Sequence, residues 1–151
     1  MSEEDEGSVS VKQYVYFALK SDVTSPDQVT ARLGFQPDRV GVRGSRQASP
    51  PVPATHTWAV ECRKPRMTVD EQITEVLDRI RPIANGIRAL VEPGEIEASL
   101  QVVRYFEIDE IEPEAPGEGR SESLLGWHLT IADLAFLVSI DADVHIDEHS
   151  V

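Results

Sequence analysis

The stretch Thr68–Leu90, TVDEQITEVLDRIRPIANGIRAL, has the longest uninterrupted hydrophobic period in this chain. Thr68 and Glu71 have the spacing of a capping box, so a helix is expected to begin there. Pro82 predicts a kink, and Gly86 is expected to loosen the last turns. A helix with a single apolar side needs a sheet to cover. The apolar residues recur at steps of three and four, which places them on one helical stripe: Val69, Ile73, Val76, Leu77, Ile80, Ile83, Ile87 and Leu90.

Several other segments alternate apolar and polar residues, as half-buried strands do. Two of them carry one polar residue each on the side that is otherwise apolar, namely Gln13 and Arg104. The strands expected from this alternation are Val11–Lys20, His56–Arg63, Ile96–Glu107 and Ala142–Asp147, with a short one possible over Arg39–Arg43.

Two shorter helices are predicted from their end signals. Ser25-Pro26-Asp27-Gln28 opens the first, which should stop at Gly34. Thr130 and Asp133 again have capping-box spacing, and an apolar helix is expected to run from there to about residue 140.

The order of these elements predicts an α+β fold. The first six fit a ferredoxin-like two-layer sandwich (βαββαβ) with an antiparallel sheet, to which a C-terminal helix and strand are added. In that arrangement the Val11 strand is central, between the Ile96 and His56 strands. The alternative is a mixed sheet with helices on both faces, in which the last helix covers the second face.

The net charge of −13 over 151 residues is distributed unevenly. Residues 107–151 contain 12 acids and one base, which gives −11, whereas residues 8–106 contain 13 bases and 11 acids. We expect a disordered acidic tail over residues 1–8 and a single domain over residues 9–149, with a flexible acidic loop at 109–123. The shortage of cationic side chains disfavours nucleic acid as a partner.

Other features of composition bound the class of protein. No apolar run is long enough to span a bilayer, so no membrane partner is expected. Cys62 is the only cysteine, which excludes an intrachain disulfide and a cysteine-rich zinc site. A cytoplasmic protein without a cofactor fits these features best.

The chain resembles a bacterial family of domains of unknown function, DUF4279, over about residues 12–149. This family consists of small α+β domains, so the resemblance implies a fold and no activity. Where this chain has His149, the family often has a tyrosine. The matching stretches are Ser25-Pro26, Arg32-Leu33-Gly34-Phe35-Gln36-Pro37, Gly44 ahead of Trp58, the helix from Asp70 to Leu90, Leu129-Thr130, Leu134, and Asp143-Val144-His145-Ile146-Asp147.

All three tyrosines are expected on the sheet face opposite the helices. Pairing of the Val11 and Ile96 strands would bring Tyr14 and Tyr16 near Tyr105, because cross-strand neighbours lie about 5 Å apart. Such a surface would bind a protein or a small ligand. The alternative is that the C-terminal helix and strand cover it as a second core.

A second candidate is a site for a small anionic ligand on the loop before the His56 strand. Arg43 and Arg46 could clamp a carboxylate or phosphate, with His56 and Trp58 beside them and Trp127 and His128 as a further wall. The alternatives are a solvated loop and tryptophans that serve as core anchors.

The other basic cluster is not expected to join this site. Arg63, Lys64 and Arg66 lie at the far end of the His56 strand, about 25 Å away at the usual rise per residue.

The last strand has a spacing that metal sites use. His145, Asp147 and His149 share one face of it, but the alternation with Val144 and Ile146 already explains the pattern as a strand with a core side and a solvent side. We therefore predict no metal site. Because no nucleophile–base arrangement or phosphate loop is present, no catalytic residue is predicted either.

These features favour a non-catalytic protein-interaction module, with a protein partner or self-association. The alternative function is an anionic-ligand binding protein or enzyme that uses the loop site.

Overall fold

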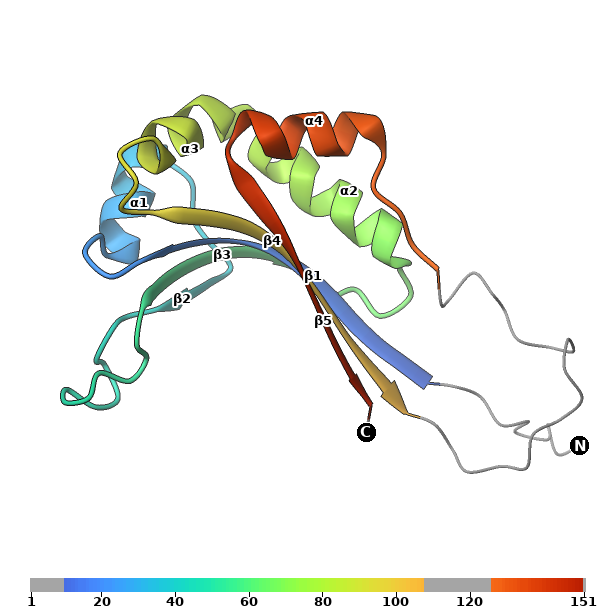
Figure 1. The fold of residues 1–151 in the computed structure, drawn as a ribbon, viewed down its shortest axis with the longest axis horizontal. Coiled ribbons are helices and arrows are strands. Elements are labelled where there is room, and N and C mark those ends of the chain that lie inside the picture. Colours follow the sequence, from blue (N-terminus) through green and yellow to red (C-terminus); the bar gives the residue numbers. More distant parts are fainter. Residues whose placement is uncertain (1–9, 108–125, 151) are drawn as a thin grey trace, which may run out of the picture.

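A five-stranded sheet organises the computed structural model, which describes residues 10–107 and 126–150. The strand order is β2-β3-β1-β4-β5. Figure 1 shows the sheet arching beneath the helices, which all lie on one side of it. The strands are β1 (Ser10–Ser21), β2 (Arg39–Gly41), β3 (His56–Cys62), β4 (Glu97–Glu107) and β5 (Ala142–Ser150).

The direction of the strands differs from the prediction at one edge. β1 is central and antiparallel to β3 and β4, as predicted, and β2 is antiparallel to β3. β5, however, runs parallel to β4, so the sheet is mixed and the predicted antiparallel sheet is wrong at this edge. The reason is the crossover through α4 (Ile131–Ser139), because a helical connection returns the chain to the end where the previous strand began.

The long predicted helix is divided into two at Pro82. α2 (Val69–Ile80) is followed by a 3₁₀ turn over Arg81–Ile83 and then by α3 (Ala84–Val91). A proline cannot donate the hydrogen bond that would continue α2. The chain therefore forms two separate helices where the sequence predicted one kinked helix. The capping box at the start of α2 is confirmed.

Gly86 has a different role from the one predicted. A Cβ atom at this position would lie 2.7 Å from Leu33 Cδ2 of α1 (Pro26–Leu33). The glycine therefore lets α3 approach α1 closely, which is a packing requirement rather than a way to loosen the helix.

The last helix lies on the same face as the others. Leu137 and Ile140 are buried in the core that α2 and the sheet form. Arg88 Nε of α3 donates to the Ser139 carbonyl oxygen at 2.7 Å, and the Arg81 guanidinium lies 4.5 Å from the centre of the Phe136 ring. Figure 1 shows α4 beside α2 above the sheet. The alternative in which this helix covers the second face is therefore wrong.

The two polar exceptions on the core side of the strands pair with each other. Gln13 of β1 lies directly opposite Arg104 of β4, and Arg104 Nε donates to Gln13 Oε1 at 3.3 Å. Gln13 Nε2 in turn donates to the Met67 carbonyl oxygen at 3.1 Å. Each polar side chain thus has a partner, as burial requires.

Two predictions concern segments outside the described residues, namely the acidic tail at 1–8 and the loop at 109–123. None of the helices in the described ranges is long and apolar enough to cross a membrane.

Candidate functional site

The sheet face opposite the helices carries all three tyrosines, and we call it the tyrosine face. Tyr14 and Tyr16 lie on β1 and Tyr105 on β4. The register places Tyr14 opposite Val103 and Tyr16 between Gln101 of β4 and Glu61 of β3. Within residues 10–107 and 126–150 no helix lies on this face, so the predicted placement of the three tyrosines on the sheet face opposite the helices agrees with the fold. The three tyrosine side chains are half-buried there.

The aromatic rings of this face form two stacked pairs. The Tyr14 and Tyr16 rings have centroids 5.9 Å apart and an interplanar angle of 21°. The Tyr105 ring stacks on the imidazole of His149 from β5, with centroids 4.9 Å apart and an angle of 15°. The aromatic surface therefore extends over three neighbouring strands.

Two arginines that sequence reasoning did not connect with the tyrosines lie over them. The guanidinium of Arg39 lies 5.0 Å from the centre of the Tyr16 ring, and that of Arg63 lies 3.9 Å from the centre of the Tyr14 ring. Their Nε atoms approach Glu61 Oε2 at 3.5 and 3.1 Å. Glu61 thus holds both guanidiniums over the rings, where cation–π attraction adds to the ion pairs.

This arrangement corrects the expected separation of the two basic clusters. Arg39 pairs with Ala59, near the middle of β3, and not with the start of that strand. Arg39 and Arg63 consequently share one carboxylate, although Arg63 was expected to lie about 25 Å from the Arg39–Arg46 loop.

The hydroxyls of Tyr16 and Tyr105 stay protonated at neutral pH, because the pKa of each is raised. Burial raises the pKa of Tyr16, and the nearby Arg39 offsets only part of that effect. The pKa of Tyr105 is raised as well, and the largest cause is electrostatic repulsion from the neighbouring Tyr14. Both phenols therefore present a hydrogen-bond donor as well as an acceptor.

The residues of the predicted anionic-ligand site are not brought together. Arg43 and His56 do meet, because the Arg43 backbone N–H donates to His56 Nδ1 at 3.0 Å. Arg43 Nη1 also donates to the Asp22 carbonyl oxygen at 3.4 Å. These contacts fix the base of the loop.

Trp58 is a core residue. Its side chain is buried, its Nε1–H donates to Thr30 Oγ1 at 3.1 Å, and its ring lies 6.0 Å from that of Phe35. The tryptophan therefore anchors α1 to the sheet on the helix side and is not exposed to a ligand.

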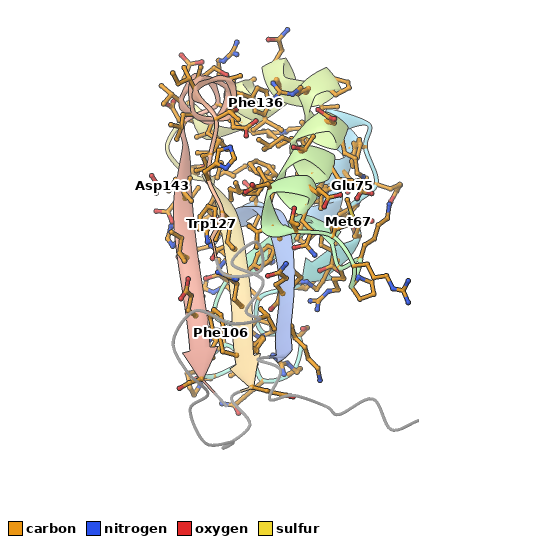
Figure 2. The ribbon with its side chains drawn as sticks, turned by 90° about the vertical axis from the view of Figure 1, so that its right-hand side faces the viewer. Met67, Glu75, Phe106, Trp127, Phe136 and Asp143 are labelled. Carbon is orange, nitrogen blue, oxygen red and sulfur yellow. The ribbon has the colours of Figure 1, made fainter. Side chains whose placement is uncertain are left out.

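Trp127 and His128 lie elsewhere on the helix side. The His128 backbone N–H donates to Asp70 Oδ1 at 2.8 Å, and its Nδ1 lies 3.1 Å from Asp70 Oδ2 at the start of α2. Trp127 packs against the core, and Figure 2 shows it beside β4. These contacts join the chain before α4 to α2 and do not include His56 or Trp58.

Arg46 lines a separate hollow of about 510 Å³ on the loop between β2 and β3. The other side chains that can reach an anion there are Arg39, Ser45 and Thr57. A small anionic ligand would therefore meet Arg39 in this hollow and would not meet the predicted His56 and Trp58.

The histidines and aspartates of β5 project to the tyrosine-face side of the sheet. His149 Nε2 lies 2.9 Å from Asp147 Oδ1, and His145 Nε2 lies 4.0 Å from Asp143 Oδ2. In the described part of the chain, no three histidine, cysteine, aspartate or glutamate side chains are grouped so as to hold a metal ion.

A family model with the description "Domain of unknown function (DUF4279)" matches residues 11–151. The chain belongs to this family. The match covers nearly the whole chain, which confirms the resemblance found in the sequence. No curated protein and no solved structure gives a significant match to this DUF4279 chain.

The sequence signal for the missed arginines lies in the strand alternation of this DUF4279 domain. Arg63 continues the polar side of β3 after Ala59 and Glu61, which is the side that carries the tyrosines across the sheet. To predict that Arg39 lies over Tyr16, the register of β2 against β3 would also have to be known. A strand of three residues is too short for its sequence to specify that register.

Proposed function

We propose that this protein is a non-catalytic interaction module whose partner protein binds the tyrosine face. The observation that carries the proposal is that the described helices all lie on the other face. This leaves Tyr14, Tyr16 and Tyr105 half-buried, beside two arginines that are already oriented by a carboxylate.

The chemistry of the face supports a protein partner. Tyrosine and arginine are enriched among the residues that dominate binding energy at protein interfaces. Because Glu61 holds Arg39 and Arg63, less side-chain freedom is lost when a partner binds. The net charge of −13 supports a polypeptide rather than a nucleic acid as the partner.

Two finer inferences accompany this proposal. We infer that β1–β4 with α1 and α2 form a ferredoxin-like unit, to which α4 and β5 are added, because neighbouring strands in the order β2-β3-β1-β4 are antiparallel. A cytoplasmic location in a bacterium is also part of the proposal, supported by the single cysteine and by the family resemblance.

The experiment compares proteins captured from the native host by the wild type and by Tyr16→Glu. The substitution places a second carboxylate directly opposite Glu61 and removes the ring beneath Arg39. The matched control is Val23→Glu, which adds the same charge at an exposed position between β1 and α1. Thermal unfolding of all three proteins checks that they are folded.

We expect specific partners to be retained by Val23→Glu and lost by Tyr16→Glu. Binding of each partner is then repeated with purified components, and NMR shift changes should centre on the three tyrosines. Identical partners for all three proteins, or shifts confined to the helix side, would contradict the proposal.

A second candidate function is binding of a small anion in the hollow lined by Arg39 and Arg46. Its volume of about 510 Å³ is within the range of small-ligand sites. A ligand among a panel of phosphates and organic acids should raise the unfolding temperature in a concentration-dependent way. At a ligand concentration of 100 times Kd, the free energy of unfolding should increase by about 2.7 kcal/mol. Arg46→Ala should abolish the shift, and no shift across the panel for the wild type would exclude this function.

A further inference from the structure

The strand β5 forms one edge of the sheet and has a described neighbour on one side only. Natural proteins usually protect such an edge by making it short or by placing lysine or proline on it. β5 is nine residues long and contains neither residue, and its charged side chains are the carboxylates of Asp143, Asp147 and Glu148. Its outer side thus presents a row of backbone donors and acceptors to another strand.

The side chains of β5 are arranged so that the strand complements itself. Asp143, His145, Asp147 and His149 all project to the tyrosine-face side. In an antiparallel pair of two β5 strands centred on Ile146, the residue numbers of opposite residues sum to 292. Asp143 then faces His149 of the second copy, and His145 faces Asp147, which gives four acid–histidine pairs across the axis.

Neighbouring registers lack this complementarity. When the numbers of opposite residues sum to 290, His145 faces His145 of the second copy and Asp143 faces Asp147. When they sum to 294, Asp147 faces Asp147. Like charges directly opposite each other on a sheet are destabilising. Of these three registers, only the one centred on Ile146 places no carboxylate of this face opposite another, so the carboxylates of β5 favour it over its two neighbours.

Apolar side chains gather at the same edge. Of the eight large apolar side chains that are exposed in the described part of the chain, four lie on α4 and β5. Ile131, Leu134 and Val138 are 86, 44 and 74% exposed and recur at helical spacing, and Ile146 of β5 is 55% exposed.

The stripe on α4 faces away from the body of the protein. Phe136, roughly half a helical turn from it, lies against Arg81, and Figure 2 shows Phe136 on the side of α4 toward α2, with α4 above β5. A strand added along β5 would pass beside this stripe and shield it from water.

We propose that two copies of this chain associate by antiparallel pairing of their β5 strands, with Ile146 at the two-fold axis. The two sheets then form one continuous sheet of ten strands. This interface uses the edge of the sheet and the outer side of α4 and does not include the three tyrosines. It shares one residue with the tyrosine face, namely His149, which stacks on Tyr105.

The first test measures the mass of the full chain by sedimentation from roughly 1 to 300 µM, a range that covers micromolar association. We expect a concentration-dependent shift from 16.7 kDa to twice that mass. A mass of 16.7 kDa throughout would overturn the proposal.

An exchange of acid and histidine tests the register. His145→Asp places a new carboxylate opposite Asp147 at two symmetric positions, and it should weaken the dimer Kd about ten-fold. The double variant with Asp147→His as well restores an acid–histidine pair, and its Kd should return to within about three-fold of the wild type. A dimer that is insensitive to His145→Asp, or that the double variant does not restore, would overturn the register and with it the proposal.

Cross-linking provides a measurement that does not depend on charge. Ile146→Cys places two thiols opposite each other at Cα separations of about 4.5–5.5 Å, within the reach of a disulfide. With copper–phenanthroline and oxygen as the oxidant, this variant should form a covalent dimer, whereas Val40→Cys on the opposite edge should not. The native Cys62 is buried and contributes little background. Equal cross-linking of both variants would contradict pairing through β5.

Discussion

Gln72→Glu provides a sensitive test of how α2 is attached to the sheet. Gln72 is fully buried, and its Nε2 donates to the carbonyl oxygens of Gln13 and Lys64, both at 3.2 Å. A glutamate at this position directs oxygen atoms at two acceptors. Its ionised form has no proton to donate, whereas its protonated form restores one hydrogen bond.

The magnitude follows from the linkage between protonation and folding. Glutamate in the unfolded chain has a pKa of about 4.3, and buried glutamates reach about 8–9. Between about pH 5.5 and 7.5 the folded state therefore holds a proton that the unfolded state has lost. Stability falls as pH rises, by about 1.4 kcal/mol per pH unit, which is roughly 2.7 kcal/mol over this interval.

The assay is urea unfolding at several pH values, followed by the fluorescence of the buried Trp58 and the half-buried Trp127. Gln72→Met is the matched control, because it has a similar volume and does not titrate. It should cost about 1–3 kcal/mol for the two carbonyls left without this donor, with little change in that cost across the pH range. If the stabilities of Gln72→Glu and Gln72→Met differed by a constant amount at every pH, residue 72 would not be buried against these carbonyls.

Three further predictions concern other parts of the molecule. Burial raises the pKa of Asp38, but its hydrogen bonds, including one from Arg79 at 2.6 Å, outweigh that effect and hold it below the ordinary value. The stability from ionised Asp38 is present above about pH 3.9 and is lost as pH falls through the folded pKa, so Asp38→Asn should cost more at about pH 6 than at about pH 3 in thermal unfolding. Burial raises the pKa of Cys62, so its thiol should react with Ellman's reagent slowly in the native protein and rapidly in urea; equal rates would contradict its burial. Thr68→Ala removes the α2 cap and should cost about 1 kcal/mol in urea unfolding, whereas Thr74→Ala, on the exposed side of the helix, should cost nothing; equal losses would argue against the cap.

Local patterns in the sequence predicted most of the elements, because each element buries one face. The three capping boxes at Ser25, Thr68 and Thr130 all form, since each requires contacts over only three residues. Gln13 and Arg104 were recognised as exceptions, but their pairing depends on a strand register that joins residues 91 positions apart.

The side of the sheet that α4 occupies was not predicted, although a physical rule specifies it once β5 is known to pair with β4. β3 and β4 are both antiparallel to β1, so they run in the same direction, and α2 connects them. Crossovers between parallel strands are almost always right-handed. A further step in the same direction, from β4 to β5, therefore places α4 on the face that already carries α2. Local sequence does not reveal which edge of the sheet β5 joins.

The candidate site was predicted in part. The tyrosines were grouped correctly by strand alternation, and the same alternation placed Trp58 with Val60 and Cys62 on the core side. The prediction that Trp58 lines a ligand site ignored this alternation. Arg39 was missed as a neighbour of Tyr16 because the pairing of β2 with β3 is set by tertiary structure.

The central position of β1 affects how this chain can fold while it is being synthesised. β1 is made first, but its pairs with β4 join residues such as Ser10 and Glu107, and its pairs with β3 join residues such as Ser21 and His56. Translation proceeds at about 5–20 residues per second. For several seconds, therefore, the strand that will lie at the centre of the sheet emerges from the ribosome without the neighbour on its β4 side. Its apolar residues remain available to chaperones until β4 has been made as well.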